Sequence, residues 1–461
     1  MSKNKVKDPL TSTTLEKILY GLGDVGVNII WALPSSFLML YYTDSVGISA
    51  AYIGTMMLIC RLFDGVSDIL MGVIIDKTHT KWGKARPWLL FMGLPLIVSV
   101  FLTFHVPGSW SESAQKVYSF VTYFVMSVIC YTAVNLAYHS MLPRFSLTSQ
   151  DRSVTSVIRS IFSLIITIAV STVTTMLLAA FGGEASQTAW TTVVILYGVI
   201  AEIAILVTFF GVKEKNLLDQ DADGCESKRP SFAHAVKVLL SSRYFYIAVY
   251  LFFAFYIANG TSGIMVYYAR DIMGNANLMG LLSIAGIVPI MLGSPFCPAL
   301  FKRFGKRNTM FYGMILAAVC SSLKLIQPTN LIWYLVFSFI TSLGSAPLMS
   351  AMYTLAGDIV DYNQWKHGVR TEGIATSVNS IGMKVGTGLG SALLGWLLAW
   401  GHYDAALAQQ PDSALRAMII VAVVIPIVIY ATAAIVLAFW DLEKYQDQIV
   451  AFLEAKEKAH E

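Results

Sequence analysis

Long apolar stretches alternate with short polar connections along the whole chain. Each stretch has about 20 residues or more, the length that an α-helix needs to cross the hydrocarbon core of a bilayer. There are twelve, at approximately residues 18–42, 50–76, 86–106, 117–142, 151–181, 189–211, 243–271, 276–301, 308–326, 331–358, 371–400 and 414–440. This pattern predicts an all-α membrane protein with twelve transmembrane helices.

The composition agrees with a protein that lies mostly in lipid. Hydrophobic residues make up 56% of the 461-residue chain and charged residues 13%, whereas soluble domains carry about 25% charged residues. The net charge of +4 is spread over many loops, so the lipid bilayer is the expected partner and nucleic acid is not. Residues 1–17 are polar and the first apolar stretch is too long for the core of a signal peptide, so we expect no cleaved leader.

Basic residues in the connections predict the orientation of the chain. Lysine and arginine occupy the N-terminal tail, every second connection and the C-terminal tail. The other connections hold only Lys116, Arg270, Lys324 and Arg416. Because positively charged loops stay in the cytoplasm, both termini are predicted to be cytoplasmic, in a multi-pass protein of the bacterial inner membrane.

The longest polar interval, residues 212–242, divides the twelve stretches six and six. We therefore predict an N-terminal six-helix half at 1–211, a cytoplasmic middle loop at 212–242, a C-terminal six-helix half at 243–440 and a cytoplasmic tail at 441–461. A short basic turn containing glycine follows the second stretch at Lys81–Arg86 and the eighth at Phe301–Arg307. Two six-helix halves with similar basic turns at equivalent places are typical of the major facilitator fold, in which the solute site lies between the halves.

Three charges share one face of the second predicted helix. Arg61, Asp64 and Asp68 are spaced i, i+3 and i+7 inside an apolar stretch. A charge at the centre of a bilayer costs about 2.5 kcal/mol or more, so it normally faces a bundle interior or a water-filled cavity. The aspartate pair therefore predicts a cation-binding site. The alternative is that both aspartates only neutralise Arg61 and a cation on another helix.

Further polar residues lie inside predicted membrane helices. They are Asp24 and Asn28 in the first helix, Thr132, Asn135 and His139 in the fourth, Arg159 in the fifth and Lys384 in the eleventh. Those on the same helix follow one another at intervals of about one turn and share a face. Each residue can contribute to a polar solute site or to a structural contact between helices. For Arg159 and Lys384 the structural alternative is an ion pair, and for His139 it is a hydrogen-bonded core histidine.

A set of short motifs occurs in a fixed order along the chain. It comprises Tyr20–Asp24, Tyr41–Asp44, Arg61–Asp68, Lys81–Trp88, Gly357–Tyr362, Gly368–Gly373 and Lys384. This set resembles the glycoside–pentoside–hexuronide cation symporter family of the major facilitator superfamily, whose best-known member is the melibiose permease. The resemblance extends over nearly the whole chain.

The resemblance implies two binding sites. The cation site of the family matches Asp64, Asp68, Thr132 and Asn135 of this sequence. The sugar site matches Asn28, Asn135, His139, Arg159 and Lys384, and Asp24 adds a carboxylate at a similar level. Asn28 and Asn135 stand where the melibiose permease has carboxylates, and His139 stands where it has a tryptophan. These departures argue against a melibiose-like specificity and against sodium as the coupling ion.

Other side chains are expected to have mainly structural roles. Asp358, Asp361, Arg370 and Glu372 flank a cytoplasmic turn, where salt bridges would lock the cytoplasmic side, and we group Arg61 with these gating residues. Trp31, Tyr41, Tyr42, Trp396 and Trp400 are expected to anchor the membrane interfaces. An aromatic ring that faced the cavity would instead stack on a pyranose.

Together these features predict a secondary active transporter that moves a glycoside, pentoside or hexuronide with a cation by alternating access. A proton is the expected cation, because Asn135 removes one anionic ligand. Three membrane cations, Arg61, Arg159 and Lys384, match three membrane anions, so we favour a neutral sugar over an anionic one. The anions are Asp24, Asp64 and Asp68.

Two alternatives remain at this stage: a carrier or flippase of lipid-like amphiphiles with the same fold, and a membrane sensor that does not transport. The sequence has no phosphate-binding loop, no metal-ligand cluster with recognised spacing and no Ser/His/Asp arrangement. We therefore expect neither an enzyme nor a cofactor, other than a co-transported H⁺ or Na⁺.

Overall fold

The computed structural model describes residues 12–214, 241–368, 372–407, 409–445, 448–449 and 451–452. Side chains are described for these residues except 149, 353, 356 and 372–381. The regular elements of this described part are helices, without any β-strand. The chain divides into two compact units, residues 1–225 and residues 226–461.

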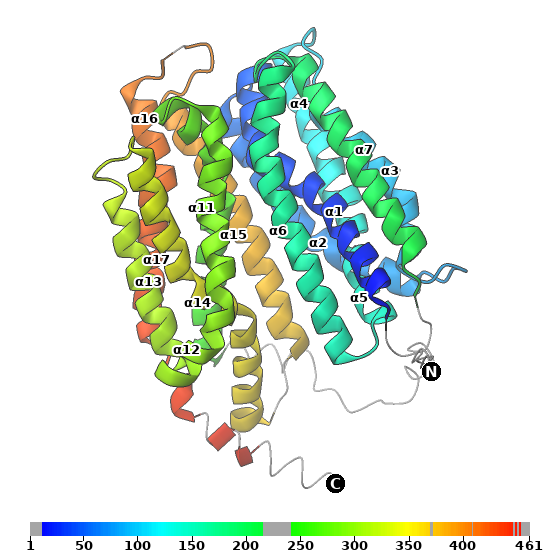
Figure 1. The fold of residues 1–461 in the computed structure, drawn as a ribbon, viewed down its shortest axis with the longest axis vertical. Coiled ribbons are helices and arrows are strands. Elements are labelled where there is room, and N and C mark those ends of the chain that lie inside the picture. Colours follow the sequence, from blue (N-terminus) through cyan, green and yellow to red (C-terminus); the bar gives the residue numbers. More distant parts are fainter. Residues whose placement is uncertain are drawn as a thin grey trace, which may run out of the picture. The chain divides into compact units, whose positions relative to one another are not determined.

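In the first unit, long helices run up and down beside one another (Figure 1). They are α1 (Thr14–Leu40), which continues as the π-helical turn η1 (Tyr41–Val46), α2 (Ala50–Lys77), α3 (Arg86–Thr103), α4 (Glu112–Phe124), which passes through η2 (Val125–Tyr131) into α5 (Thr132–Phe145), α6 (Ser149–Ala180) and α7 (Gln187–Gly211).

The second unit is built in the same way (Figure 1). It contains α9 (Arg243–Gly260), α10 (Ile264–Tyr267), η4 (Tyr268–Ile272), η5 (Ala276–Leu278), α11 (Met279–Gly293), η6 (Ser294–Phe296), α12 (Cys297–Phe304), α13 (Lys306–Leu323), α14 (Leu331–His367), α15 (Glu372–Trp400), α16 (Asp412–Ile419), η7 (Ile420–Val424), α17 (Ile425–Ala438) and η8 (Leu442–Tyr445).

Among the residues that the structure describes, each of the twelve predicted stretches lies mostly in helix, and the seventh is divided between α9 and the segment formed by α10 and η4. In the described residues, eight helices are long and apolar enough to cross a membrane, and there are nine if the bent pair Arg243–Gly260 and Ile264–Ile272 is one span. The tenth stretch was expected to end at residue 358, but α14 continues to His367 and stops at Gly368, whose φ is 67°. The hydrophobic pattern ended early because the last turns of α14 carry charged residues such as Asp358 and Asp361.

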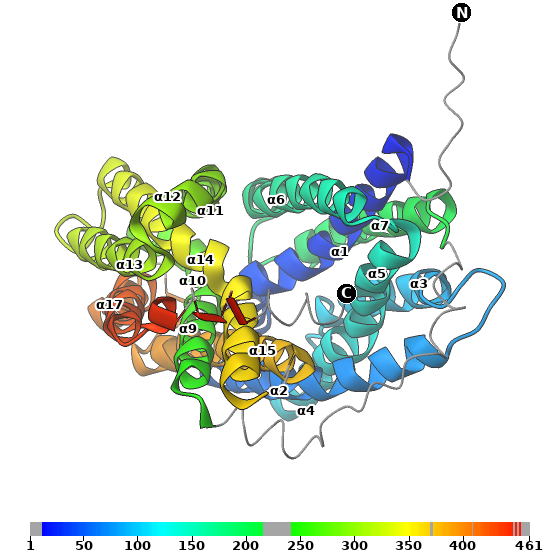
Figure 2. The ribbon, with the colours of Figure 1, turned by 90° about the horizontal axis from the view of Figure 1, so that it is seen from below.

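The same helix pairs pack together in both units. In the first unit α1 lies against α6 and α7, α3 lies against α5 and α7, and α2 lies against α5. The equivalent helices of the second unit make the equivalent pairs: α9 with α15 and α17, α13 with α14 and α17, and α11 with α14. Figure 2, which looks along the bundles, shows α1 lying beside α6 and α7, and α13 lying beside α17. The weak sequence similarity between the two halves thus corresponds to a structural repeat.

The basic turn before α3 is held by a glutamate from the end of α7. The carboxylate of Glu214 accepts hydrogen bonds from the backbone N–H groups of Lys84, Ala85 and Arg86, at 3.0, 2.9 and 2.7 Å. An anion at this position satisfies the open N–H groups of a helix N-terminus and complements its dipole. Gly83 has a φ of 110°, and a Cβ there would lie 2.5 Å from the Glu214 carboxylate. Glycine is therefore required where the turn passes the glutamate.

The second unit repeats this arrangement with its own residues. The Glu443 carboxylate accepts from the backbone N–H of Arg307 at 2.5 Å, and Gly305, with a φ of 82°, lies against that carboxylate. The arginine of each turn also donates hydrogen bonds to backbone carbonyls near the C-terminal end of α7 or α17. Arg86 donates to the carbonyl of Phe209, and Arg307 donates to the carbonyls at the end of α17. The basic turns are visible in the sequence, whereas their contacts with the two glutamates appear only in the structure.

Helices α9 and α15 approach each other through glycines. A Cβ on Gly260 would lie 2.2 Å from the carbonyl oxygen of Thr387 and 2.9 Å from the Cα of Gly390, and a Cβ on Gly390 would lie 2.3 Å from the carbonyl oxygen of Ile257. Small residues permit this close approach, which gives van der Waals contact between helix backbones in lipid.

We predict that Gly260→Ala lowers the thermal stability of the purified protein in detergent, because an added methyl group forces the two backbones apart at a cost of about 1–3 kcal/mol. Gly286→Ala is the matched control, because a Cβ at Gly286 in α11 would meet nothing within 4 Å. A melting temperature that is unchanged in Gly260→Ala, or lowered equally in both variants, would contradict the close packing of α9 and α15.

Candidate functional site

Helix α2 separates its charged and apolar residues onto two sides. Arg61 and Asp64 are 5% and 4% exposed, whereas Leu62, Phe63 and Val66 are about half exposed, at 49%, 52% and 56%. The helical spacing produces this division, since residues three apart lie on the same face. The predicted charged stripe therefore does face the interior of the first unit at Arg61 and Asp64.

A buried network surrounds the Asp64 carboxylate. Arg61 donates from Nη1 to Oδ2 of Asp64 at 3.2 Å, and Thr132 donates from Oγ1 to Oδ1 at 2.8 Å. Ser67 lies beside them, with its Oγ 3.3 Å from the Thr132 hydroxyl. Thr132 is the first residue of α5 and is itself buried. The network thus joins α2 to α5, and it brings together two of the four predicted cation-site residues.

The other two predicted cation-site residues lie nearby along the same helices. Asp68 is one turn beyond Asp64 on α2, and Asn135 is about one turn beyond Thr132 on α5. Both side chains are partly buried. Both helices therefore continue the polar face past the Asp64 network.

A second polar group lies around Arg159 of α6. Its Nη1 lies 2.6 Å from Nδ1 of His139, and its charge interacts with the buried carboxylate of Asp24. Because a guanidinium can only donate, Nδ1 of His139 accepts and the proton of the neutral ring is on Nε2. Asn28 donates from Nδ2 to the backbone carbonyl of Asp24 at 2.9 Å. Four predicted sugar-site residues are therefore close neighbours or are linked through Asp24.

Helix α5 contributes to both groups. It carries Thr132 in the Asp64 network and His139 beside Arg159, with Asn135 between them. The sixth predicted sugar-site residue, Lys384, belongs to α15 of the second unit and is partly buried.

The predicted gating residues are only partly within the described residues. Asp358 on α14 forms an ion pair with Lys306, the first residue of α13, and Asp361 is partly buried on α14. Arg370 and the side chain of Glu372 lie outside the described part of the chain. The sequence does not indicate Lys306 as the partner of Asp358, although Lys306 lies in the basic turn after the eighth stretch. Arg61, which we had grouped with the gating residues, pairs within α2.

The prediction that Tyr41 and Tyr42 anchor a membrane interface is wrong. Both are 0% exposed. Tyr41 donates to Oε1 of Gln187 at 2.8 Å, and Tyr42 donates to the carbonyl of Thr103 at 3.0 Å. The π-helical turn η1 at the end of α1 places both rings inside the unit, where tertiary packing outweighs the preference of tyrosine for the interface. Trp400 is 67% exposed, as an anchor would be.

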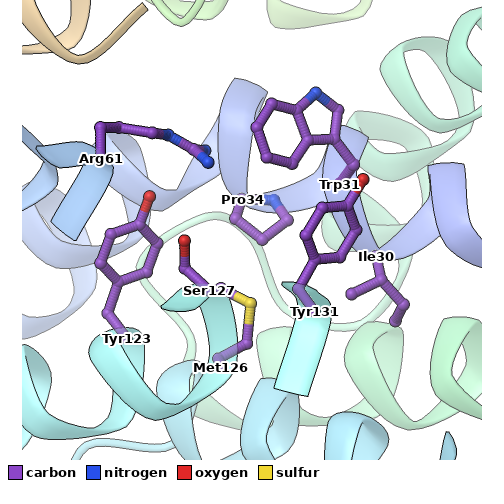
Figure 3. Close-up of a pocket in the computed structure, with 8 residues that line it drawn as sticks. All are labelled: Ile30, Trp31, Pro34, Arg61, Tyr123, Met126, Ser127 and Tyr131. Atoms are coloured by element: carbon purple, nitrogen blue, oxygen red, sulfur yellow. The ribbon is translucent and has the colours of Figure 1, made fainter. Parts of the chain in front are cut away.

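Trp31 also differs from expectation, because its ring faces Arg61. The guanidinium carbon of Arg61 lies 4.0 Å from the centre of the Trp31 ring. The two residues belong to the wall of a small hollow with room for about one water molecule, whose other lining residues come from α1, α4 and η2 (Figure 3). They are Ile30, Pro34, Tyr123, Met126, Ser127 and Tyr131. The spacing of Tyr123, Ser127 and Tyr131 by four residues was the only sequence signal for this wall.

The repeated helix pairs and the ion pairs held inside apolar helices are features of major facilitator transporters. Comparison with known proteins supports this class. The sequence model of the family described as MFS/sugar transport protein matches residues 19–444. The chain belongs to this family, which confirms the resemblance drawn from the motifs. The protein is a secondary transporter that works by symport, and not an enzyme.

Individual relatives match over almost their whole length. The chain is 34% identical over 446 residues to the isoprimeverose transporter of Lactiplantibacillus pentosus, covering 96% of this chain and 91% of that protein. It is 28% identical over 430 residues to the inner membrane symporter YicJ of Escherichia coli (strain K12), covering 91% and 90%. The fold is similar to the crystal structure of the nucleoside transporter NupG, with a TM-score of 0.65 at 14% identity over 94% of this chain and 100% of that one.

Proposed function

We propose that the protein moves a glycoside, pentoside or hexuronide together with a monovalent cation across the bacterial inner membrane by alternating access. Both termini lie in the cytoplasm, and the halves at 1–211 and 243–440 are joined by the cytoplasmic loop at 212–242 and followed by the tail at 441–461. The names of the relatives support this proposal, since one is an isoprimeverose transporter and another an inner membrane symporter. The strong bias of basic residues toward one set of connections supports the orientation.

The cation site is assigned to Asp64, Asp68, Thr132 and Asn135. The observation that carries this assignment is the bond of the Thr132 hydroxyl to the buried Asp64 carboxylate. Carboxylate, hydroxyl and amide oxygens are the ligands of hard cations, and a carboxylate can also take a proton. Two carboxylates one turn apart in a medium of low dielectric repel each other, so a bound cation relieves that repulsion. Cation binding is then favourable in one arrangement of α2 and α5 more than in another, as coupling requires.

The sugar site is assigned to Asp24, Asn28, Asn135, His139 and Arg159, with Lys384 added through the family resemblance. The proton on Nε2 of His139 and the remaining donors of Arg159 can bind sugar hydroxyls, and the Asn28 and Asn135 amides offer donors and acceptors. Because Arg159 is compensated by Asp24, the local charge suits a neutral sugar. The cytoplasmic gate is assigned to Asp358, Asp361, Arg370 and Glu372, and the ion pair of Asp358 with Lys306 supports it.

The first prediction concerns coupling. Asp64→Asn or Asp68→Asn should abolish uptake against a gradient in membrane vesicles while exchange of labelled substrate persists, because the charge is lost and the shape is kept. Asp76→Asn is the matched control on the same helix. Its carboxylate is 77% exposed and pairs only weakly with Arg144, at 3.5 Å, so accumulation should stay near the wild-type level. If both single variants at Asp64 and Asp68 still concentrate the sugar, the assigned cation site is wrong.

The second prediction concerns the identity of the cation. With an amide at Asn135, the site has one anionic oxygen fewer for a hard cation, whereas a proton needs only one carboxylate. We expect a protonophore to abolish accumulation and Na⁺ to have little effect at fixed pH. Uptake that Na⁺ stimulates after the pH gradient has collapsed would identify sodium instead.

The third prediction concerns the sugar. In binding measurements with a glucoside and its glucuronide, we expect the neutral glucoside to bind at least as tightly, since the charge of Arg159 already interacts with that of Asp24. The opposite result would be a glucuronide that binds at least tenfold more tightly, about 1.4 kcal/mol. If that advantage also disappears in Arg159→Gln or Lys384→Gln, the transporter is a hexuronide carrier.

A further inference from the structure

Glu202 is a carboxylic acid inside a membrane helix, and the transport chemistry proposed above does not use it. It lies on α7, more than two helical turns from the nearer end of the helix. On the same helix Ile195, Val199 and Ile203 are about half exposed, at 50%, 53% and 56%, so this part of α7 borders lipid. An ionisable side chain at such a depth is costly, and its surroundings decide which of its two forms is stable.

The Glu202 carboxyl lies against the backbone of α3, which runs beside α7 (Figure 1). A Cβ on Gly93 of α3 would lie 2.9 Å from Oε2 and 3.2 Å from Oε1 of Glu202. The two helices stay close further along, since a Cβ on Gly198 would lie 2.7 Å from the side chain of Ile97. Oε2 is buried and has no hydrogen-bond partner among the described residues. The carboxyl therefore fills the space left by a glycine, without the donors that a carboxylate requires.

Charges on the neighbouring helices are engaged elsewhere. The helices packed against α7 are α1, α3 and α6. Their charged and titratable residues are Glu16, Lys17, Tyr20 and Asp24 on α1, Arg86 on α3, and Asp151, Arg152 and Arg159 on α6. Lys17 pairs with Asp151, and Arg86 donates to the carbonyl of Phe209. Arg159 interacts with Asp24. Burial, and not one of these charges, is what acts on the Glu202 carboxyl, so an ionised Glu202 would be an uncompensated charge.

We propose that Glu202 is a proton-binding site additional to the proposed cation site, and that α3 packs on α7 only while the Glu202 carboxyl carries its proton. The bound proton removes a charge that the space between the helices cannot compensate. A carboxylate would have to leave Gly93 for water, which loosens α3 from α7. The inference does not depend on the proposed cation site, because the aspartates of α2 take no part in it.

The first test is the thermal stability of the purified protein in lipid nanodiscs. The unfolded chain exposes Glu202 to water, where a glutamate ionises above about pH 4.3, whereas the packed helices keep its proton. Unfolding then releases a proton, so the free energy of unfolding falls as the pH rises. Glu202→Gln is neutral at every pH and lacks this loss. We expect its melting temperature to equal that of the wild type at about pH 5 and to exceed it by at least about 2 °C at about pH 8.

Glu112→Gln is the matched control for the charge change. Glu112 lies at the start of α4, its side chain is 69% exposed, and it pairs with Lys116 within its own helix. Its carboxylate is ionised in the folded and the unfolded chain at both pH values. The difference in melting temperature between this variant and the wild type should therefore be the same at both.

The second test uses the wild-type chain and a hydrophobic reagent, N,N′-dicyclohexylcarbodiimide. The carboxyl proton moves to one nitrogen of the reagent while a carboxyl oxygen bonds to its central carbon. The acyl group then moves to nitrogen, which leaves a stable N-acylurea and releases nothing. We expect mass spectrometry to find this adduct on the peptide that contains Glu202. A water-soluble carbodiimide with a soluble amine should modify the exposed Glu112 and leave Glu202 unmodified.

Two results would overturn the inference. One is a difference in melting temperature between the wild type and Glu202→Gln that does not change with pH. The other is a Glu202 that only the water-soluble reagent modifies, as expected for an ionised side chain that reaches water. Glu202→Gln should still accumulate sugar, and a loss of accumulation would contradict a site that is additional to the coupling site. The proposed cation site fails by a different result, which is retained accumulation in both Asp64→Asn and Asp68→Asn.

Discussion

The buried positive charge of Arg61 is the constraint on which the centre of the first unit depends. A guanidinium held away from water is costly unless a carboxylate and further polar groups surround it. Asp64 supplies the charge and Trp31 supplies an aromatic face. Asp64 in turn is positioned by the Thr132 hydroxyl, which ties α2 to α5. One charge therefore determines the contacts of three helices, α1, α2 and α5.

Helix α5 is the element through which the two polar groups can influence each other. It is attached to α1 by a reciprocal pair: Tyr20 donates to the carbonyl of Tyr138 at 3.0 Å, Tyr138 donates to the carbonyl of Tyr20 at 2.8 Å, and their rings stack at 4.5 Å. These contacts join α1, which carries Asp24, to α5, which carries His139. By contrast, α2 meets α5 at the Asp64–Thr132 bond. A change in the ligands of Asp64 therefore acts directly on the pair of helices that holds the residues around Arg159.

The structural repeat shows which features belong to the fold and which to the transport chemistry. Both units have the same helix pairs, and in both a glutamate from the last helical region caps the N-terminus of the third span. These features recur because each half must satisfy the same helix ends and pack the same apolar faces. The Arg61–Asp64–Thr132 network and the group around Arg159 belong to α1, α2, α5 and α6 of the first unit. The proposed cation site therefore lies within the first unit.

The sequence by itself predicted the all-helical membrane fold and the inward stripe of Arg61 and Asp64, because hydropathy over 20 residues and helical spacing are local properties. It also identified the family, through ordered motifs. Only the tertiary structure decided which groups meet. Thr132 bonds Asp64 across 68 positions of sequence, Glu214 caps a helix 128 positions away, and Tyr41 and Tyr42 turn inward. The hollow beside Arg61 has the same origin, since its wall combines side chains of α1, α2, α4 and η2. Such contacts depend on how helices pack against one another, which no local pattern specifies.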